Sequence, residues 1–505
     1  MKIAGLDIGT TGCKCTVFDE NGIELGKSYR DYPVKRRVGG HEIDATALLD
    51  GVITVINEMA TEYPDIAGIG VTSFGETFVC TDEEGNPLAP AMLYTDPRGN
   101  EECRWLVEKL GEKHIAEITG VTAHEMYGLP KMLWVKNNKP EIFGKTKHIL
   151  QMEDFVVFTM TGNAVIDYSL ATRSMAFDIN TLDWSEEILN IAGIDKALLS
   201  KPVPTGTDAG EITDKMAERT GLSKGTRIIA ISQDQVAAAV GAGAFDGSVG
   251  VDGAGTVQCL TPIYDELPDI DKMIPGKYVA VPYVVPGKYV TYAFSYTGGA
   301  LIQWCTDNVA KKEKDIAKEE GISVNAYLER QYAENRTSDG LDPDGPSGML
   351  MLPHFAGAAT PYMDTGSKGV MVGMTTATTP ADIYRACMEG VCYEMYLNYE
   401  NVLKAGAAPK KLHATGGGAK SKVWMQMKAD VLGIPIVALK TVDAGTVGSA
   451  MLTGIALGVF KDLKAASDAM VEQTVTYEPR AEYHEKYMEV YKKYAKLYSS
   501  VRELM

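Results

Sequence analysis

Four short segments combine carboxylates, hydroxyls and glycines in patterns that could bind phosphate or move a proton. The first is Asp7-Ile8-Gly9-Thr10-Thr11-Gly12. Its glycines allow a tight turn that presents N–H groups to phosphate oxygens, and its threonine hydroxyls add further donors. Asp7 could hold Mg²⁺ directly or through water, and Lys14 adds a positive charge nearby. Taken alone, the segment is equally compatible with an ordinary glycine-rich β-turn.

A second turn, Gly255-Thr256, repeats part of this pattern in the other half of the chain and follows Asp252. Two such turns facing each other would clamp a triphosphate from opposite sides. A plain hairpin is the alternative for this turn on its own. The pair of turns is more informative than either turn alone.

The third segment, Ser232-Gln233-Asp234-Gln235, follows an apolar strand at 228–231 and precedes a run of small residues at 236–243. A carboxylate at the end of a strand and the start of a helix lies where α/β folds bind ligands. Asp234 could therefore accept a proton from a hydroxyl that attacks a phosphoryl group. The alternative is a helix N-cap without a catalytic role.

The fourth segment, Gly416-Gly417-Gly418-Ala419-Lys420-Ser421, lies between a predicted strand and a predicted helix. Three consecutive glycines let a flat group, such as adenine with its ribose, lie against the backbone. A structural turn is the alternative.

Strands predicted at 2–9, 14–19, 66–72, 228–231 and 247–257 alternate with helical patterns such as 48–59 and 101–109, which indicates an α/β architecture. The echo of the first turn near Gly255 suggests two related halves with a boundary around 244–248. The polar stretch 311–348 predicts one solvated helix followed by a surface loop. Five tyrosines recur at helical spacing between 483 and 498 and predict one face of a docked terminal helix.

Composition limits the classes of function. The chain has 505 residues, 45% hydrophobic and 23% charged, which allows two or three globular domains. A net charge of -18 disfavours nucleic-acid binding, although backbone dipoles can still hold a small anionic nucleotide. Eight scattered cysteines suggest neither a zinc site nor disulfides, and we expect Cys13 and Cys15 to be reduced in the core. Neither a signal peptide nor a run of roughly 18 apolar residues is visible, which predicts a cytoplasmic protein.

Together these segments resemble the FGGY carbohydrate kinases, a branch of the actin/Hsp70/hexokinase-like ATPases, over essentially the whole chain. Met126-Tyr127-Gly128-Leu129-Pro130-Lys131-Met132-Leu133-Trp134 is similar to the first family signature, with Gly128 where Pro, Ser or Thr is usual. Gly369-Val370-Met371-Val372-Gly373-Met374, followed by Ala386-Cys387-Met388-Glu389, is similar to the second, with Cys387 as a mild departure.

The resemblance implies an α/β fold of two ribonuclease H-like (actin-like ATPase) domains, with mixed sheets flanked by helices around an interdomain cleft. Residues 1–245 would bind the sugar and carry the catalytic base, and residues 246–505 would bind ATP. Asp234 would be the base, and Asp7 would lie near Mg²⁺. The sugar would contact Gly75, Glu76, Thr77, Asp96 and Gln235. ATP would be held by Thr10, Thr11, Lys14, Gly255, Thr256, Gly298, Gly299, Gly416, Gly417, Gly418 and Ser421.

The identity of the acceptor depends on segments that depart from the main subgroups. Ser73-Phe74-Gly75-Glu76-Thr77 lacks the Gly-Gln-Met-His-Gly pattern typical of xylulose kinases. It keeps a Glu-Thr pair like that of glycerol kinases but has Gly75 where they carry Arg. Tyr94-Thr95-Asp96-Pro97-Arg98 resembles a sugar-contacting segment of xylulose kinases. Phe355-Ala356-Gly357-Ala358-Ala359-Thr360-Pro361 replaces the usual Gly-Glu-Arg-Thr-Pro, so the role of that Glu-Arg pair is absent or is supplied elsewhere.

We therefore expect a small sugar or polyol as acceptor, with a ketopentose such as xylulose favoured. Ribulose, fuculose, glycerol and erythritol are alternatives. An actin- or Hsp70-like ATPase acting on a protein partner is the alternative from another class. We expect neither a nucleic-acid nor a membrane partner, and the family resemblance admits a homodimer.

Overall fold

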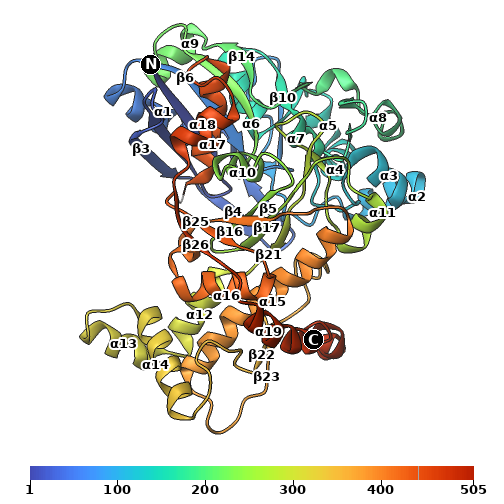
Figure 1. The fold of residues 1–505 in the computed structure, drawn as a ribbon. Helices are drawn as coiled ribbons and strands as arrows, with labels where there is room; N and C mark the ends of the chain where they lie inside the picture. The colour runs from blue at the N-terminus through green and yellow to red at the C-terminus, as the bar shows by residue number, and fades with distance from the viewer. Residues whose placement is uncertain (442) are drawn as a thin grey trace.

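The computed structural model describes residues 1–441 and 443–505 and contains two six-stranded mixed sheets (Figure 1). The strand order of the first sheet is β14-β15-β6-β1-β2-β3. Its strands are β1 (Lys2–Ile8), β2 (Gly12–Phe18), β3 (Glu24–Asp31), β6 (Ile66–Ser73), β14 (Thr207–Glu211) and β15 (Arg227–Gln233). β1, β2 and β3 pair antiparallel, β1 pairs parallel with β6 and β6 with β15, and β14 closes the edge antiparallel.

The second sheet repeats this connectivity in the order β21-β17-β16-β24-β25-β26. Its strands are β16 (Val249–Ala254), β17 (Gln258–Thr261), β21 (Ala293–Ser295), β24 (Lys411–Thr415), β25 (Ile436–Leu439) and β26 (Gln473–Tyr477). The antiparallel pairs β16–β17, β17–β21 and β25–β26 and the parallel pairs β16–β24 and β24–β25 correspond one to one with the first sheet. The predicted α/β class and the duplication of the fold are both confirmed.

The side chains of β1 alternate between the two faces of the first sheet. Ala4, Leu6 and Ile8 belong to a core shared with helix α1 (Ala45–Glu62), as do the buried free thiols Cys13 and Cys15 on β2. Because side chains alternate along a strand, Asp7 lies on the opposite face with Ile3 and Gly5. The prediction of a reduced cysteine pair in the core is confirmed.

The opposite face of the first sheet is covered by helix α17 (Ala444–Ala456), which comes from the second half of the sequence and also packs on α10 (Asp234–Gly241). The helices approach closely at two glycines. A Cβ atom on Gly448 would lie 1.9 Å from the carbonyl oxygen of Ala237, and one on Gly241 would lie 2.0 Å from that of Ala444. This crossing of α10 and α17 joins the two halves of the chain. It lies beside the first sheet, as Figure 1 shows and as the contacts of α17 with β1 and β6 confirm.

We expect Gly448→Ala to lower the free energy of unfolding by about 1–3 kcal/mol, because the added methyl group overpacks the crossing. Gly→Ala within a helix normally has the opposite sign, about 1 kcal/mol stabilising. Urea titration followed by circular dichroism measures the change. Ala456→Ser, on the exposed end of the same helix, serves as the control and should be near neutral. A stabilised Gly448→Ala variant would show that the helices separate at no cost.

The remaining long helices include α2 (Asn100–Leu110), α3 (Glu112–Thr119), α4 (Gly128–Asn138), α6 (Met152–Thr161), α12 (Gly299–Asn308), α15 (Pro380–Lys404), α16 (Lys422–Leu432), α18 (Leu463–Met470) and α19 (Ala481–Tyr494). Among the helices of the described chain, none combines the length and the apolar character that a bilayer crossing requires. The predicted tyrosine face is confirmed for three of the five tyrosines, since Tyr487, Tyr491 and Tyr494 of α19 are buried. Tyr498 lies on a separate short helix, α20 (Leu497–Val501).

The prediction for 311–348 is wrong in one respect. The stretch forms two helices, α13 (Lys311–Glu319) and α14 (Val324–Ser338), before the loop. A second helix begins because Ser323 caps it by accepting a hydrogen bond from the N–H of Ala326. Its Tyr327, Leu328 and Tyr332 are buried, so α14 is docked and only partly solvated.

Candidate active site

The turn between β1 and β2 holds the first phosphate-binding candidates. Gly9 N–H donates to the carbonyl of Gly12 at 2.9 Å, which closes the turn, and Tyr32 N–H donates to the carbonyl of Thr11 at 3.1 Å. Thr10 is half-buried and Thr11 is exposed. Both residues therefore lie in a tight turn, as the sequence predicted.

Asp7 precedes this turn and lies beneath the start of α17. A Cβ atom on Gly445 would lie 2.7 Å from its Oδ2, so the helix start approaches the carboxylate closely. Burial raises the pKa of Asp7 to about 6; Lys14 opposes this rise and Asp443 adds to it. Lys14 is itself paired with Asp443, which also accepts from Lys27 at 3.3 Å. Lys14, which was predicted to lie near the phosphates, thus also links the first sheet to Asp443, the residue that precedes α17.

Asp234 is the first residue of α10, directly after β15. The N-cap is Gln233, so the interpretation of Asp234 as a plain cap is wrong. Burial is the main cause that raises the pKa of Asp234 to about 7, and the negative charges of Asp7 and Glu76 contribute to this rise. The structure thus places Asp7 and Glu76 within electrostatic reach of Asp234, and it gives Asp234 the pKa that a general base needs near neutral pH.

Gln233 fixes the position of Asp234. Its Nε2 donates to Asp234 Oδ1 at 2.5 Å, and its Oε1 accepts from the N–H of Gln235 at 3.0 Å. The N–H of Gln233 donates in turn to Ser169 Oγ at 2.9 Å, and Ser169 donates to the buried carboxylate of Asp167 at 2.9 Å. This chain of hydrogen bonds holds the start of α10 against the residues that precede Arg173.

Glu76 forms the acidic part of a buried ion pair that the sequence did not predict. Its backbone has φ 65°, a left-handed conformation that is uncommon for a residue other than glycine. Arg173 Nε donates to Glu76 Oε1 at 2.6 Å, and both side chains are 7% exposed. Gly75 leaves room for this arginine, because a Cβ atom there would lie 3.0 Å from Arg173 Cγ. The positive charge of Arg173 also acts on Asp234.

The other predicted sugar contacts differ in their surroundings. Thr77 is buried, and its hydroxyl has no hydrogen-bond partner among the described residues. Asp96 accepts from Arg98 Nε at 2.8 Å and from the N–H of His41 at 2.7 Å. Its carboxylate is thus already engaged by protein donors, whereas Gln235 uses only its backbone N–H in the contact with Gln233.

The glycine segments of the second half meet at one place. Gly298 N–H donates to the carbonyl of Thr256, and Gly299 N–H to that of Gly255, both at 2.9 Å. A Cβ atom on Gly416 would lie 2.7 Å from the carbonyl oxygen of Ala254, directly before the turn. By contrast, a Cβ atom on Gly417 would meet nothing within 4 Å. The predicted turn at Gly255, the predicted junction at Gly416 and the start of α12 at Gly298 thus form a single surface with open space above Gly417. Gly418 lies against the same strand end.

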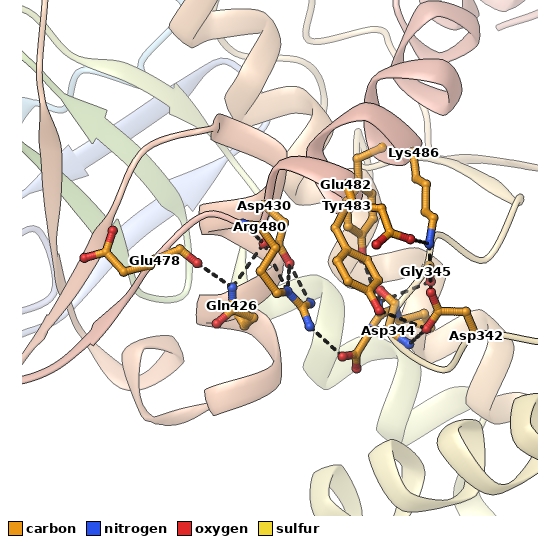
Figure 2. Close-up of polar contacts among 12 residues, drawn as sticks. Asp342, Asp344, Gly345, Gln426, Asp430, Glu478, Arg480, Glu482, Tyr483 and Lys486 are labelled. Atoms are coloured by element: carbon orange, nitrogen blue, oxygen red, sulfur yellow. Dashed lines mark hydrogen bonds and ion pairs between the residues drawn. The ribbon is translucent and has the colours of Figure 1, made fainter.

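Helix α16 continues from this surface and is fixed at both ends. Ser421 caps it and donates to Glu329 at 3.0 Å. Figure 2 shows Arg480 between Asp430 of α16 and Asp344. Arg480 donates to Asp430 at 2.7 Å and to Asp344 at 2.6 Å, and its guanidinium lies 3.8 Å from the ring centre of Tyr483. The segment that begins α19 therefore holds α16 in place through charged side chains.

A buried ion pair ties α16 to the strand before the phosphate turn. Lys428 Nζ lies 2.7 Å from Asp252 Oδ2, and both side chains are fully buried. Lys428 also donates to Gln258 Oε1 at 2.8 Å and lies 4.8 Å from the centre of the Trp424 ring. Asp252, which matches Asp7 in the sequence pattern, therefore differs from Asp7 in its charge environment, because Lys428 neutralises it.

The residues around Asp7 fit a magnesium ion that brings its own ligands. In residues 1–441 and 443–505, no group of three or more histidine, cysteine or acidic side chains could enclose a metal. Mg²⁺ instead favours one or two carboxylates together with waters and substrate phosphates. Burial is the largest cause of the raised pKa values of Asp7 and Asp234, and neighbouring carboxylates add to both, so a cation bound here would offset negative charge that is held away from water.

Comparisons with known proteins agree with this geometry. The model of the FGGY family of carbohydrate kinases, N-terminal domain, matches residues 2–241, and that of the C-terminal domain matches residues 254–457. A xylulose kinase of Bacillus subtilis is 26% identical over 507 residues, covering 99% of this chain and 97% of that protein. A gluconokinase of the same organism is 28% identical over 481 residues, covering 94% and 91%. The crystal structure of a ligand-bound xylulose kinase from Lactobacillus acidophilus superposes with a TM-score of 0.88 at 23% identity, covering 99% and 98% of the two chains.

Proposed function

This chain belongs to the FGGY family of carbohydrate kinases, and we propose that it transfers the γ-phosphate of ATP to a hydroxyl of a ketopentose such as xylulose. The observation that carries the proposal is the placement of Asp234, whose raised pKa responds to both Asp7 and Glu76. The similarity to xylulose kinases over nearly the whole chain supports the choice of acceptor.

In this proposal Asp234 takes the proton from the attacking hydroxyl. A base with a pKa of about 7 is partly ionised at neutral pH and strong enough to accept that proton as the oxygen–phosphorus bond forms. Glu76 and Gln235 orient the acceptor through its other hydroxyls, because carboxylate and amide oxygens each accept from hydroxyl groups. Asp96 contributes by holding Arg98 and the backbone of His41 in place.

The phosphates of ATP would lie between the two glycine-rich turns. Backbone N–H groups and hydroxyls of Thr10, Thr11, Gly255 and Thr256 would bind them, with Gly298 and Gly299 supporting the second turn. The adenosine would lie on Gly416, Gly417 and Gly418 before the cap at Ser421. Asp7 would hold Mg²⁺, directly or through water, and the ion would neutralise phosphate charge during transfer. We also propose that the acceptor half ends at residue 245 and the nucleotide half begins at 246.

A coupled ADP-release assay with MgATP tests the proposal across ketopentoses, ketohexoses, aldoses, aldonates, glycerol and four- and five-carbon polyols. We expect xylulose to give the highest kcat/KM, in line with the similarity to xylulose kinases over nearly the whole chain. We also expect ADP release to depend on the acceptor, because its hydroxyl attacks the phosphate beside Asp234. Strong activity confined to another acceptor would overturn the ketopentose assignment. ADP release that no sugar stimulates would overturn the kinase assignment for this site.

Glu76→Gln should raise the KM for the acceptor about 10- to 100-fold and leave the KM for ATP within about twofold. The change removes the charge that anchors Arg173 and weakens the acceptance of substrate hydroxyls. Steady-state kinetics with each substrate varied in turn measures both constants. Glu83→Gln, at an exposed position, is the matched control. Equal effects on both KM values would remove Glu76 from the acceptor site.

A further inference from the structure

Three buried polar atoms without hydrogen-bond partners meet at one small cavity. They are Thr122 Oγ1, Arg173 Nη1 and Tyr292 Oη, unpartnered among the residues that the structure describes. The three residues are only 4%, 6% and 6% exposed. Because buried polar groups are nearly always paired in folded proteins, three at one cavity indicate a missing partner.

The cavity adjoins the proposed acceptor site and takes its walls from both halves of the chain. Arg173 shares its guanidinium with Glu76, and its charge acts on Asp234. The ring of Tyr127 lies 5.1 Å from Arg173 Cζ, and that of Tyr292, which directly precedes β21 in the second sheet, lies 5.7 Å away. Tyr292 also responds to the charge of Asp234, so the cavity lies close to the base.

The chemistry of the three groups favours one kind of oxygen. The guanidinium of Arg173 donates hydrogen bonds and cannot accept them, and the hydroxyls of Thr122 and Tyr292 can both turn to donate. A ketone or carboxylate oxygen brings no proton and can accept from all three. An alcohol in the same place brings a further proton. If it donates that proton to the hydroxyl of Thr122 or Tyr292, the proton of that hydroxyl is left without an acceptor, because Arg173 offers none.

We infer that this cavity receives a proton-free oxygen of the acceptor, the ketone of a ketose or the carboxylate of an aldonate, and thereby selects against the corresponding alditol. The inference rests on the proposed function and deepens it, because it names the group of the acceptor that is recognised. It also supplies a role for Arg173, which no pattern in the sequence singled out.

The test compares acceptors that differ only at the carbon that carries this oxygen. Xylulose is paired with xylitol and gluconate with D-glucitol, and kcat/KM is measured for each with MgATP. The wild-type protein should prefer the ketose or the aldonate of a pair at least about tenfold. Calorimetric binding of the same pairs to the ADP complex gives the preference independently of turnover. A larger preference within the xylulose pair would indicate that the cavity receives a ketone, and a larger preference within the gluconate pair would indicate a carboxylate.

Tyr292→Phe is the decisive variant, because it removes a hydroxyl that has no partner and should leave folding intact. It should reduce the preference about tenfold, mainly through weaker binding of the preferred member, with little change for the alditol. Tyr393→Phe is the matched control, since it also removes a buried, unpartnered tyrosine hydroxyl, but in the core beneath α19. The Tyr393→Phe variant should prefer the ketose or the aldonate over the alditol as strongly as the wild type does.

Equal activity and equal binding of both members of each pair in the wild type would overturn the inference while leaving the kinase assignment intact. An unreduced preference in Tyr292→Phe would also overturn it and indicate that the cavity holds only water. If no acceptor is turned over, the proposed function fails, and the calorimetric preference still decides whether the cavity binds a proton-free oxygen.

Discussion

Asp234→Asn is expected to lower kcat by about 10²- to 10⁴-fold while the Kd for ATP stays the same or falls slightly. The amide keeps the size and the position of the side chain at the start of α10 but cannot take a proton from the acceptor hydroxyl. ATP loses a nearby negative charge, so its binding should not weaken. Single-turnover kinetics and equilibrium binding of a fluorescent ATP analogue measure the two quantities.

Asp214→Asn is a matched control, because Asp214 is also the first residue of a helix, α9 (Asp214–Thr220), and lies on the surface. Both variants remove a carboxylate from a helix start, where it interacts favourably with the helix dipole. Only the Asp234 variant should lose activity. Wild-type turnover in Asp234→Asn would mean that another group takes the proton.

The pH dependence of the same reaction follows from the raised pKa. Because the base must be ionised, kcat/KM should rise with pH and level off above about pH 7, the pKa of Asp234. Glu76→Gln removes a negative charge that raises this pKa, so its acidic limb should move to lower pH. The pH profiles of the two proteins measure this displacement.

Lys428→Met is expected to destabilise the second half of the chain by about 3–5 kcal/mol, because it leaves Asp252 buried without a counter-charge. The affected strand, β16, leads directly to Gly255 and Thr256. We therefore also expect weaker ATP binding at temperatures where the protein remains folded. Urea titration of the free energy of unfolding, followed by the fluorescence of Trp424 and the other tryptophans, measures the loss.

Lys440→Met provides the comparison, since Lys440 pairs with Glu472 at 2.7 Å on the surface, where ion pairs contribute little. It should barely change the unfolding midpoint. Combining Lys428→Met with Asp252→Asn should recover much of the loss, because no uncompensated charge then remains buried. A single Lys428→Met variant as stable as the wild type would mean that water reaches Asp252 or that the pair is not formed.

Local patterns predicted much of the architecture. The turn at Gly9 and Gly12, the strand before Asp234 and the junction at Gly416 all depend on residues adjacent in sequence, and all form as expected. The echo between the turns after Asp7 and Asp252 predicted a duplicated sheet. That similarity did not reveal that a lysine pairs with the buried carboxylate of Asp252 and leaves Asp7 in a different environment. Lys428 lies far from Asp252 in sequence, within the largely buried helix α16.

Long-range contacts account for what was missed. Arg173 belongs to no recognisable motif, and only the folded chain brings it to Glu76 and Tyr292. The close crossing at Gly241 and Gly448 likewise joins two helices from different halves, and neither glycine belongs to a turn motif. In the stretch 311–348, polar composition concealed the three buried residues of α14 and the cap at Ser323.

Proton transfer to Asp234 during phosphorylation of a sugar is tested by a stoichiometric measurement of ADP and phosphorylated acceptor. Both are quantified by ³¹P NMR after incubation with MgATP and xylulose, for the wild type and for Asp234→Asn. We expect one equivalent of sugar phosphate for each ADP in the wild type, no ADP without the sugar, and loss of both products in the variant. ADP formation that does not depend on a sugar, or that persists in Asp234→Asn, would refute this role of Asp234.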